Sequence, residues 1–408
     1  MKQCFFGAEI LLPRFVNDPE KMKKWACVAC DQYTSEPDYW ERVGNFVGDS
    51  ESTLRVTLPE IWLGEAEKRI PVINQTMERY LETVLKPFPD SMIYLERTLR
   101  NGRVRKGVIG AVDLECYDYN KGAKSLVRAT EGTVLERIPP RVRIREGAPI
   151  ELPHIMILID DPGRTVIEPL SGEKLKVAYD FDLMENSGHV RGGFIPADTQ
   201  ARIISALEKL AVGENPLLFA MGDGNHSLAS AKAYWEEIKP TLTVSERETH
   251  PARFALAEIV NIHDDALDFE PIYRVVFGVE PEKLRAELRA YAAALPENDS
   301  PAQTITLVTS GGEEDIVFEN PTSFLPVGTL QSFLDRFVKE SGAKLDYIHG
   351  IDSVKKLVSR DSVGFIFRGM EKSDLFPTVI ADGALPRKTF SMGEADDKRF
   401  YLEARRIK

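Results

Sequence analysis

The chain has 408 residues, of which 43% are hydrophobic and 28% are charged, and its formal net charge at pH 7 is -12. This composition is that of a globular protein, and the length leaves room for two or three core-forming units. The negative charge argues against general nucleic-acid binding but still permits one local basic pocket for a small anion. No apolar run is long enough to span a membrane, and an acid, Glu9, interrupts the N-terminus before the apolar stretch of a signal peptide could develop.

The four cysteines, Cys4, Cys27, Cys30 and Cys116, are too few for a disulfide framework and favour a reducing, cytoplasmic location. Cys27 and Cys30 have the spacing of redox and zinc sites. A tetrahedral zinc site needs four ligands, however, and the sequence offers no second pair at a suitable spacing. We therefore interpret both as small core side chains of an apolar strand within residues 25–30. Neither zinc nor a disulfide is expected at this pair.

In chain order, the N-terminal part is predicted to mix strands with long turns. A helix is expected to begin near Ser35, with Ser35 as its N-cap and Asp38 completing a capping box. Apolar residues at helical spacing predict a second helix over residues 75–86. Residues 108–117 are typical of a strand, and the Asn101-Gly102 pair before them indicates a hairpin turn.

Three central segments are continuous apolar runs, typical of strands buried on both faces of a sheet: residues 155–159, 217–221 and 254–262. Helices are predicted over residues 198–211 and 225–238. Strands that alternate with helices in this way indicate an α/β fold, with a mixed sheet and flanking helices.

The sequence changes in character after about residue 276. We therefore expect a main α/β domain, residues 1–275, that carries the candidate site, and a smaller α/β domain, residues 276–408. Elements predicted in the second domain are helices over 281–294 and 328–340 and strands over 304–308 and 316–318. As an alternative, the tail returns to the first domain through a strand at 364–367, which would make that domain discontinuous.

The strongest motif lies where a buried strand gives way to a helix, at Gly222-Asp223-Gly224-Asn225-His226-Ser227. Two glycines permit positive φ and close approach of a ligand to the backbone, and free amides at a helix start bind anions. Candidate phosphate ligands are Gly222, Gly224, Asn225 and Ser227. Asp223 and His226 are candidate catalytic residues. Asp223 is also a candidate metal ligand, and His226 could donate a hydrogen bond to a phosphate.

The alternative interpretation of this motif is a plain helix cap, in which Asp223 or Asn225 satisfies the first amides of the helix. One cap needs neither two glycines nor a histidine, so the functional interpretation is favoured.

Four residues elsewhere complete the candidate site. Arg128 and Glu131 lie in a turn with two threonines and a glycine, where a guanidinium group can grip phosphate through two hydrogen bonds. Asp31 lies in a polar loop after an apolar strand, and it shares with Glu131 the role of candidate base. Arg253 precedes another buried strand and is a second candidate phosphate ligand. The remaining arginines of residues 137–145 are interpreted as a solvated charged face.

Five motifs are spread over nearly the whole chain: Val28-Ala29-Cys30-Asp31-Gln32-Tyr33-Thr34-Ser35, Arg128-Ala129-Thr130-Glu131, the turn at residues 222–227, His250-Pro251-Ala252-Arg253 and Leu385-Pro386-Arg387-Lys388-Thr389-Phe390. Together they resemble the bacterial and archaeal family called domain of unknown function 1015. That resemblance alone implies no reaction.

The central turn is also similar to the Asp-Gly-His-His-Arg motif of ParB-like free-serine kinases, which bind nucleotide phosphates at such a turn. This likeness implies a ParB/sulfiredoxin-like core with added units, and it puts Asp223, Gly224 and His226 at the phosphates. Asn225 replaces the first histidine of that motif and Ser227 replaces its arginine. The second change removes a positive charge, for which Arg128 or Arg253 would have to compensate.

The hypothesis that results is a cytoplasmic small-molecule kinase, dependent on Mg²⁺ and on ATP or ADP, that phosphorylates a free hydroxyl amino acid such as serine. Phosphoryl transfer needs cations over the developing charge and a carboxylate to orient the hydroxyl. The expected partners are the small-molecule substrate and the nucleotide, without nucleic acid or membrane. Two alternatives use the same anion pocket: a non-catalytic nucleotide- or metabolite-binding protein, and a phosphoester hydrolase with a positioned water.

Overall fold

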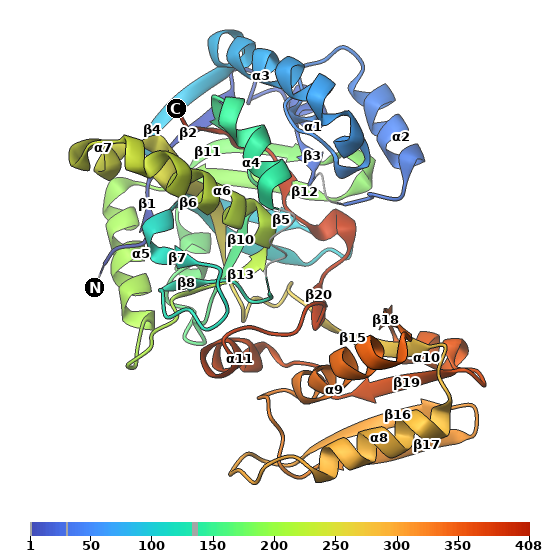
Figure 1. The fold of residues 1–408 in the computed structure, drawn as a ribbon. Coiled ribbons are helices and arrows are strands. Elements are labelled where there is room, and N and C mark those ends of the chain that lie inside the picture. Colours follow the sequence, from blue (N-terminus) through green and yellow to red (C-terminus); the bar gives the residue numbers. More distant parts are fainter. Residues whose placement is uncertain (1, 30–31, 133–137) are drawn as a thin grey trace. The chain divides into compact units, whose positions relative to one another are not determined.

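The computed structural model describes residues 2–29, 32–132 and 138–408 (Figure 1). The chain forms two compact units. The first comprises Met1–Ala129, Thr133–Leu267 and Glu394–Lys408, and the second comprises Thr130–Gly132 and Asp268–Gly393. In the part of the chain that the structure describes, no helix is both long enough and apolar enough to cross a membrane.

A ten-stranded mixed sheet forms the centre of the first unit, which confirms the predicted α/β fold. Its strand order is β11 (Lys176–Asp182), β12 (His189–Phe194), β5 (Ile93–Thr98), β6 (Val104–Asp113), β14 (Phe254–Asn261), β10 (Met156–Ile159), β13 (Phe219–Asp223), β8 (Val127–Arg128) and β7 (Tyr117–Asp118), with β1 (Phe5–Phe6) paired on β6. The three strands predicted from apolar runs, β14, β10 and β13, are neighbours in the middle of this sheet. Gly102 forms the predicted turn of the β5–β6 hairpin, with φ of 81°.

Both faces of this sheet are covered, which explains the continuous apolar runs. Alternate residues of β14 enter different cores: Leu256 belongs to the core that contains Trp25 and Tyr80, whereas Ala257 belongs to the core that contains Leu228 and Trp235. The helices behind these cores are α1 (Pro19–Trp25) and α3 (Ala66–Thr83) on the first face, and α5 (Ala197–Leu210) and α6 (Asn225–Ile238) on the second. The layers are visible in Figure 1.

Two N-terminal predictions were wrong in detail. Helix α2 (Pro37–Val47) has Glu36 at its N-cap position and no side-chain cap, so Ser35 and Asp38 do not form a capping box. The helix begins at Pro37 instead, because proline is already held near the helical φ. Helix α3 begins well before residue 75 and ends before residue 86, because β4 (Leu85–Ser91) leaves to pair with β2 (Ala8–Pro13).

Residues 25–30, which contain Cys27 and Cys30, were predicted to form a strand but do so only in part. Trp25 ends α1, and β3 (Cys27–Val28) pairs with β21 (Phe400–Tyr401). Cys27 is a buried free thiol, as the core interpretation expects, and burial raises its pKa. Cys30 lies outside the described residues.

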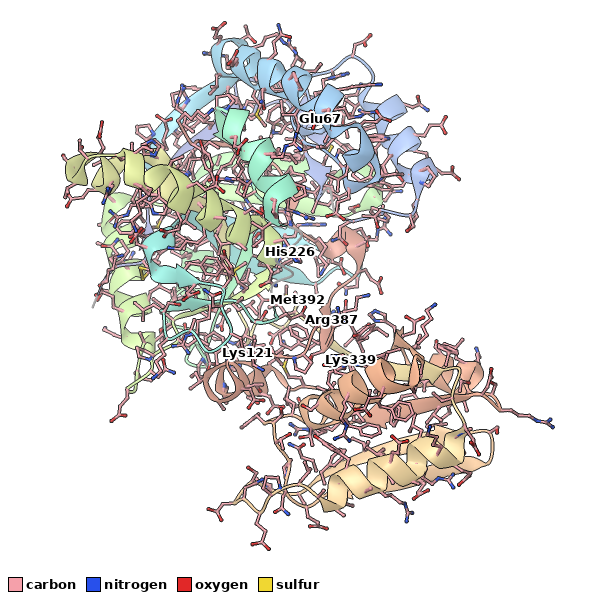
Figure 2. All side chains as sticks on the ribbon, in the orientation of Figure 1. Glu67, Lys121, His226, Lys339, Arg387 and Met392 are labelled. Carbon is pink, nitrogen blue, oxygen red and sulfur yellow. A yellow bond between two sulfur atoms is a disulfide. The ribbon has the colours of Figure 1, made fainter. Side chains whose placement is uncertain are left out.

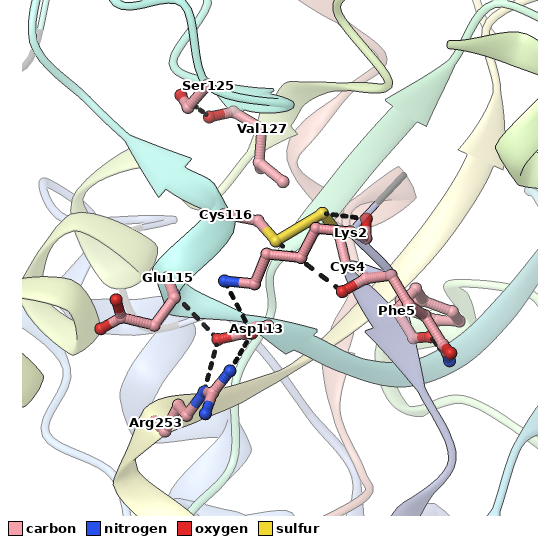
Figure 3. The surroundings of a disulfide bond; sticks show 10 residues. Lys2, Cys4, Phe5, Asp113, Glu115, Cys116, Ser125, Val127 and Arg253 are labelled. Atoms are coloured by element: carbon pink, nitrogen blue, oxygen red, sulfur yellow. Dashed lines mark hydrogen bonds and ion pairs between the residues drawn. A yellow bond between two sulfur atoms is a disulfide. The ribbon is translucent and has the colours of Figure 1, made fainter. Parts of the chain in front are cut away.

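Cys4 and Cys116 form a disulfide, which differs from the expectation that the cysteines are reduced (Figure 3). The pairing of β1 with β6 brings the N-terminus beside the turn η3 (Leu114–Cys116), so the two Cα atoms lie 5.9 Å apart. That distance is within the range of native disulfides. The cysteines are 112 residues apart in sequence, so only the strand pairing reveals the contact.

The second unit contains an antiparallel sheet of six strands. They are β17 (Gly312–Phe318), β16 (Gln303–Thr309), β19 (Ser362–Phe367), β15 (Phe269–Phe277) and β18 (Lys344–His349) in order, with β20 (Phe390–Met392) paired on β15. Its helices include α8 (Pro281–Ala293), α9 (Pro326–Ser341), α10 (Ile351–Leu357) and α11 (Leu375–Asp382). Residue 276 falls within β15, and β19 belongs to this sheet rather than to the first unit. The tail segment that does belong to the first unit is Glu394–Lys408.

Candidate functional site

The strand-to-helix turn has the local structure predicted from its sequence. β13 ends at Asp223, Gly224 follows with φ of 79°, and α6 begins at Asn225. No side chain caps α6. The Asp223 carboxylate accepts a hydrogen bond of 2.8 Å from the Gly224 amide instead. In the described part of the chain, neither Asp223 nor Asn225 therefore caps the first turn of α6, where the positive end of the helix dipole lies.

The two glycines of the turn are explained by packing. A Cβ atom at Gly222 would lie 3.0 Å from Leu158 Cγ, and one at Gly224 would lie 3.1 Å from Ile155 Cα. Gly224 is also in the left-handed region that favours glycine. Packing thus accounts for both glycines without a ligand, so they do not by themselves indicate a phosphate cradle.

A β-bulge in β13 changes the direction in which the Asp223 side chain points. Ile157 pairs with Met221, but Met156 pairs with Asp223, so one extra residue, Gly222, is inserted into β13. Bulges re-aim side chains beside functional sites. Met156 in turn pairs with Glu258 on β14, so Asp223 and Glu258 lie level with each other, two strands apart.

The tail segment Glu394–Lys408 supplies the positive charge at this turn. Lys398 Nζ lies 3.7 Å from Asp223 Oδ2, and both side chains are mostly buried. The next residue, Arg399, donates to Glu258 Oε2 over 3.1 Å. Burial alone would lower the pKa of Arg399, but Glu403 and Glu258 outweigh it and raise that pKa. Sequence reasoning missed Lys398, because only the fold reveals a contact between residues 223 and 398.

Three polar residues occupy the first turn of α6. Asn225, His226 and Ser227 are each partly exposed, and His226 is labelled in Figure 2. Within the described ranges, Asn225 Oδ1 is buried without a hydrogen-bond partner. The carbonyl oxygen of His226 accepts a hydrogen bond of 2.6 Å from Ser230. Their amides and side chains are thus grouped around the helix start.

Arg128 is not at the turn. Its Nε donates to the Ser125 carbonyl over 2.7 Å, and its Nη2 donates to Asn215 Oδ1 over 2.6 Å and to the Pro216 carbonyl over 2.9 Å. Residues 215–216 precede β13, whereas the turn follows it, about 15 Å further along the strand. Burial lowers the pKa of Arg128, which is consistent with a guanidinium held by neutral carbonyl groups.

Arg253 is also engaged elsewhere. Its Nε and Nη2 form a two-point ion pair with Asp113, at 3.0 and 2.7 Å, and Lys2 approaches the same carboxylate to 3.3 Å (Figure 3). Arg253 precedes β14 by one residue, and Glu258, which is level with Asp223, lies about 15 Å further along that strand. The two arginines expected to compensate for Ser227 therefore make other contacts.

Of the two candidate bases, Glu131 lies in the described part of the chain. Glu131 belongs to the second unit, where it accepts a hydrogen bond of 3.1 Å from the Lys388 amide. Burial raises the pKa of Glu131 to about 7. Asp31 lies outside the described residues.

The turn offers few protein ligands for a magnesium ion. Among the residues that the structure describes, no group of three or more histidine, cysteine, aspartate or glutamate side chains could hold a metal. Mg²⁺ commonly takes one or two protein carboxylates and completes its shell with substrate phosphates and water. A single carboxylate such as Asp223 would hold Mg²⁺ only together with ligands from a bound substrate.

Residues 12–337 match the model of the family described as "Protein of unknown function (DUF1015)". The chain belongs to this family. The match confirms the resemblance seen in the sequence motifs, and it includes both the turn and the Arg128–Glu131 motif of this DUF1015 member. Among curated proteins, no relative matches the chain.

Three solved structures resemble the chain distantly. A conserved hypothetical protein from Pyrococcus furiosus is 12% identical, with 73% of this chain and 94% of that chain covered and a TM-score of 0.36. SbnI from Staphylococcus aureus, truncated at its C-terminus, is 13% identical, with 70% and 82% covered and a TM-score of 0.36. A free serine kinase in complex with AMP is 12% identical, with 73% and 91% covered and a TM-score of 0.37. Likenesses this weak carry no argument about activity.

Proposed function

We propose that the turn between β13 and α6 binds nucleotide phosphates, and that the chain is a small-molecule kinase that transfers a phosphoryl group to a free hydroxyl amino acid such as serine. The observation that carries this proposal is the uncapped start of α6 beside the Asp223–Lys398 pair. A helix of 14 residues presents a positive dipole end there, and Lys398 adds a full positive charge.

Lys398 takes the place of the missing arginine in this proposal. The kinase-like motif has arginine where this chain has Ser227, and neither Arg128 nor Arg253 contacts the turn in the described part of the chain. Lysine is a point charge that suits phosphate as well as carboxylate. When phosphate binds, we expect the Lys398 ammonium group to bridge it to Asp223.

Asp223 has two roles in the proposed reaction. Its carboxylate would hold Mg²⁺ or orient the acceptor hydroxyl, and its hydrogen bond to the Gly224 amide fixes its direction. The amides of Asn225, His226 and Ser227 donate to phosphate oxygens, which stabilises the charge that develops during transfer. When bound, Mg²⁺ would neutralise part of the phosphate charge of ATP or ADP.

The experiment is an assay of ATP and ADP consumption with Mg²⁺ across free amino acids, on the full chain and on D223N. Asparagine can still accept the Gly224 hydrogen bond but loses the charge, so we expect binding to persist and turnover to fall by about 100-fold or more. D118N is the matched control, because Asp118 likewise accepts a hydrogen bond of 2.8 Å from a nearby amide, that of Asn120. Nucleotide turnover that needs no hydroxyl acceptor would reject the kinase, as would equal turnover in D223N and the wild-type chain.

A second candidate function uses the same turn without catalysis. Because Arg128 and Arg253 are engaged elsewhere, Lys398 is the cation whose contact with the turn is described. Transferring a phosphoryl group demands more charge compensation than binding a nucleotide does. Tight nucleotide binding without acceptor-dependent turnover would favour this nucleotide- or metabolite-binding protein.

A further inference from the structure

A groove in the first unit runs along helix α3, beside the end of helix α2 (Figure 1). Its volume is about 720 Å³, which is within the range of small-molecule sites. One face of α3 forms its long wall: Lys68, Arg69, Val72, Ile73, Thr76 and Arg79. The residues that line the groove include none from the turn at residues 222–227 or from the tail segment, so the groove differs from the proposed nucleotide site.

The charges that line this groove are unlike those of the chain around it. Residues 37–83 contain nine acids and five bases. Within this stretch, all of which the structure describes, one acid, Asp49, lines the groove, together with four of the five bases: Arg55, Lys68, Arg69 and Arg79. A chain of net charge -12 thus directs a local excess of positive charge into one groove, which favours an anionic ligand.

Three of these four cations lack a carboxylate partner. In the described part of the chain, neither Lys68 nor Arg79 forms an ion pair. Arg55 donates to the carbonyl oxygens of Ser50, over 2.9 Å, and Gly48, and both acceptors are neutral. An anion in the groove would therefore meet cations whose charge no described carboxylate already compensates.

Helix geometry separates these cations into two groups. Lys68 and Arg79 lie on the same face of α3, three turns or about 16 Å apart along the helix axis. The Ser52 amide donates to the Tyr80 hydroxyl group over 3.1 Å, which brings the segment that contains Arg55 to the Arg79 end. The groove therefore has positive charge at both ends.

The middle of the groove is apolar. Val72 is 62% exposed, one helical turn after Lys68, and Ile73 beside it also lines the groove. Nearer the Lys68 end, the ring of Trp62 is half-buried, and the Arg69 guanidinium group lies 4.5 Å from its centre. A ligand with an apolar body would remove this surface from water.

We propose that this groove binds an elongated organic dianion, a long-chain dicarboxylate, with one acidic group at Lys68 and the other at Arg55 and Arg79. Each carboxylate gains a charge-assisted contact, and the apolar body covers Val72. A short dianion cannot span the two ends, and a long monoanion engages only one of them. The inference does not depend on the proposed kinase activity, because the ligand and the lining residues are different.

The test is calorimetric titration of the full chain with dodecanedioate, with its monomethyl ester and with succinate. Dodecanedioate should bind saturably. The monomethyl ester keeps the apolar body but has one charge, so we expect it to bind about tenfold more weakly, and succinate should not bind measurably. Equal affinities for dodecanedioate and its monomethyl ester, or no binding of dodecanedioate, would overturn the proposal.

Two pairs of variants assign the binding to this groove. K68Q removes the cation at one end and should weaken dodecanedioate binding about tenfold, whereas K209Q, at an exposed lysine of α5, should leave it unchanged. V72E adds a negative charge in the middle of the groove and should abolish binding, whereas V212E, at a residue that is 75% exposed, should not. Because Val72 is itself exposed, the fold should tolerate the glutamate. Equal affinities within either pair would place the ligand elsewhere and reject the site.

Discussion

Two regions of the molecule bring a carboxylate and a lysine together, and they do so through different atoms. In the first unit the ammonium group of Lys398 approaches Asp223 to 3.7 Å. In the second unit the lysine contributes its main-chain amide, since the Lys388 N–H donates to Glu131 over 3.1 Å while its side chain is exposed. The first arrangement places a positive charge at the helix start, whereas in the second burial raises the pKa of the carboxyl group to about 7.

The difference shows why residue type alone does not identify a site. Each region pairs one acid with one lysine, but of the two acids only Asp223 lies at an uncapped helix start. Glu131 is instead fixed by a loop backbone whose Lys388 has φ of 53°.

Removing the charge of each lysine should separate the two regions. We expect K398Q to weaken nucleotide binding about tenfold, because one charge-assisted contact to phosphate is lost, equivalent to about 1.4 kcal/mol. K388Q is the matched control and should leave binding unchanged, since it keeps the amide that bonds Glu131. Calorimetric titration with ADP and Mg²⁺ measures the nucleotide affinity of both variants. Equal weakening in the two variants would mean that the lysines act only through general charge.

Glu131 should make stability depend on pH. Its native pKa of about 7 exceeds the ordinary value of 4.5, so the folded state favours the protonated form. Its contribution to stability is therefore fully present below pH 4.5 and is lost as the pH rises through about 7. E131Q stays neutral and should flatten this dependence, measured by hydrogen exchange of β15 and β19 amides. The exposed control E297Q should keep the wild-type profile, and an unchanged profile in E131Q would contradict the assigned pKa.

Restoring the arginine of the kinase-like motif should strengthen binding slightly. S227R adds a guanidinium group at the first turn of α6, and we expect about a threefold gain in ADP affinity. The gain is small because a positive side chain at a helix N-terminus opposes the helix dipole. Melting of the ligand-free chain should fall slightly for the same reason. A loss of affinity in S227R would show that the phosphates do not lie at this turn.

Around the turn, much of the fold could be predicted from the sequence. The range predicted for α6 agrees with Asn225–Ile238, and the apolar runs locate β10, β13 and β14, because local periodicity determines such elements. The site was less predictable. Lys398 reaches Asp223 across 175 positions of the chain, and Arg128 looked like a phosphate ligand until its carbonyl partners were known. Likewise, the glycines that suggested a ligand serve packing against Ile155 and Leu158.

The most direct measurement of the central claim is a crystal structure of the full chain with ADP and Mg²⁺. The proposal predicts phosphate oxygens about 2.7–3.2 Å from the amides of Asn225, His226 or Ser227, with the Lys398 ammonium group within reach of the same phosphate. A nucleotide bound with its phosphates away from the start of α6 would contradict the proposal.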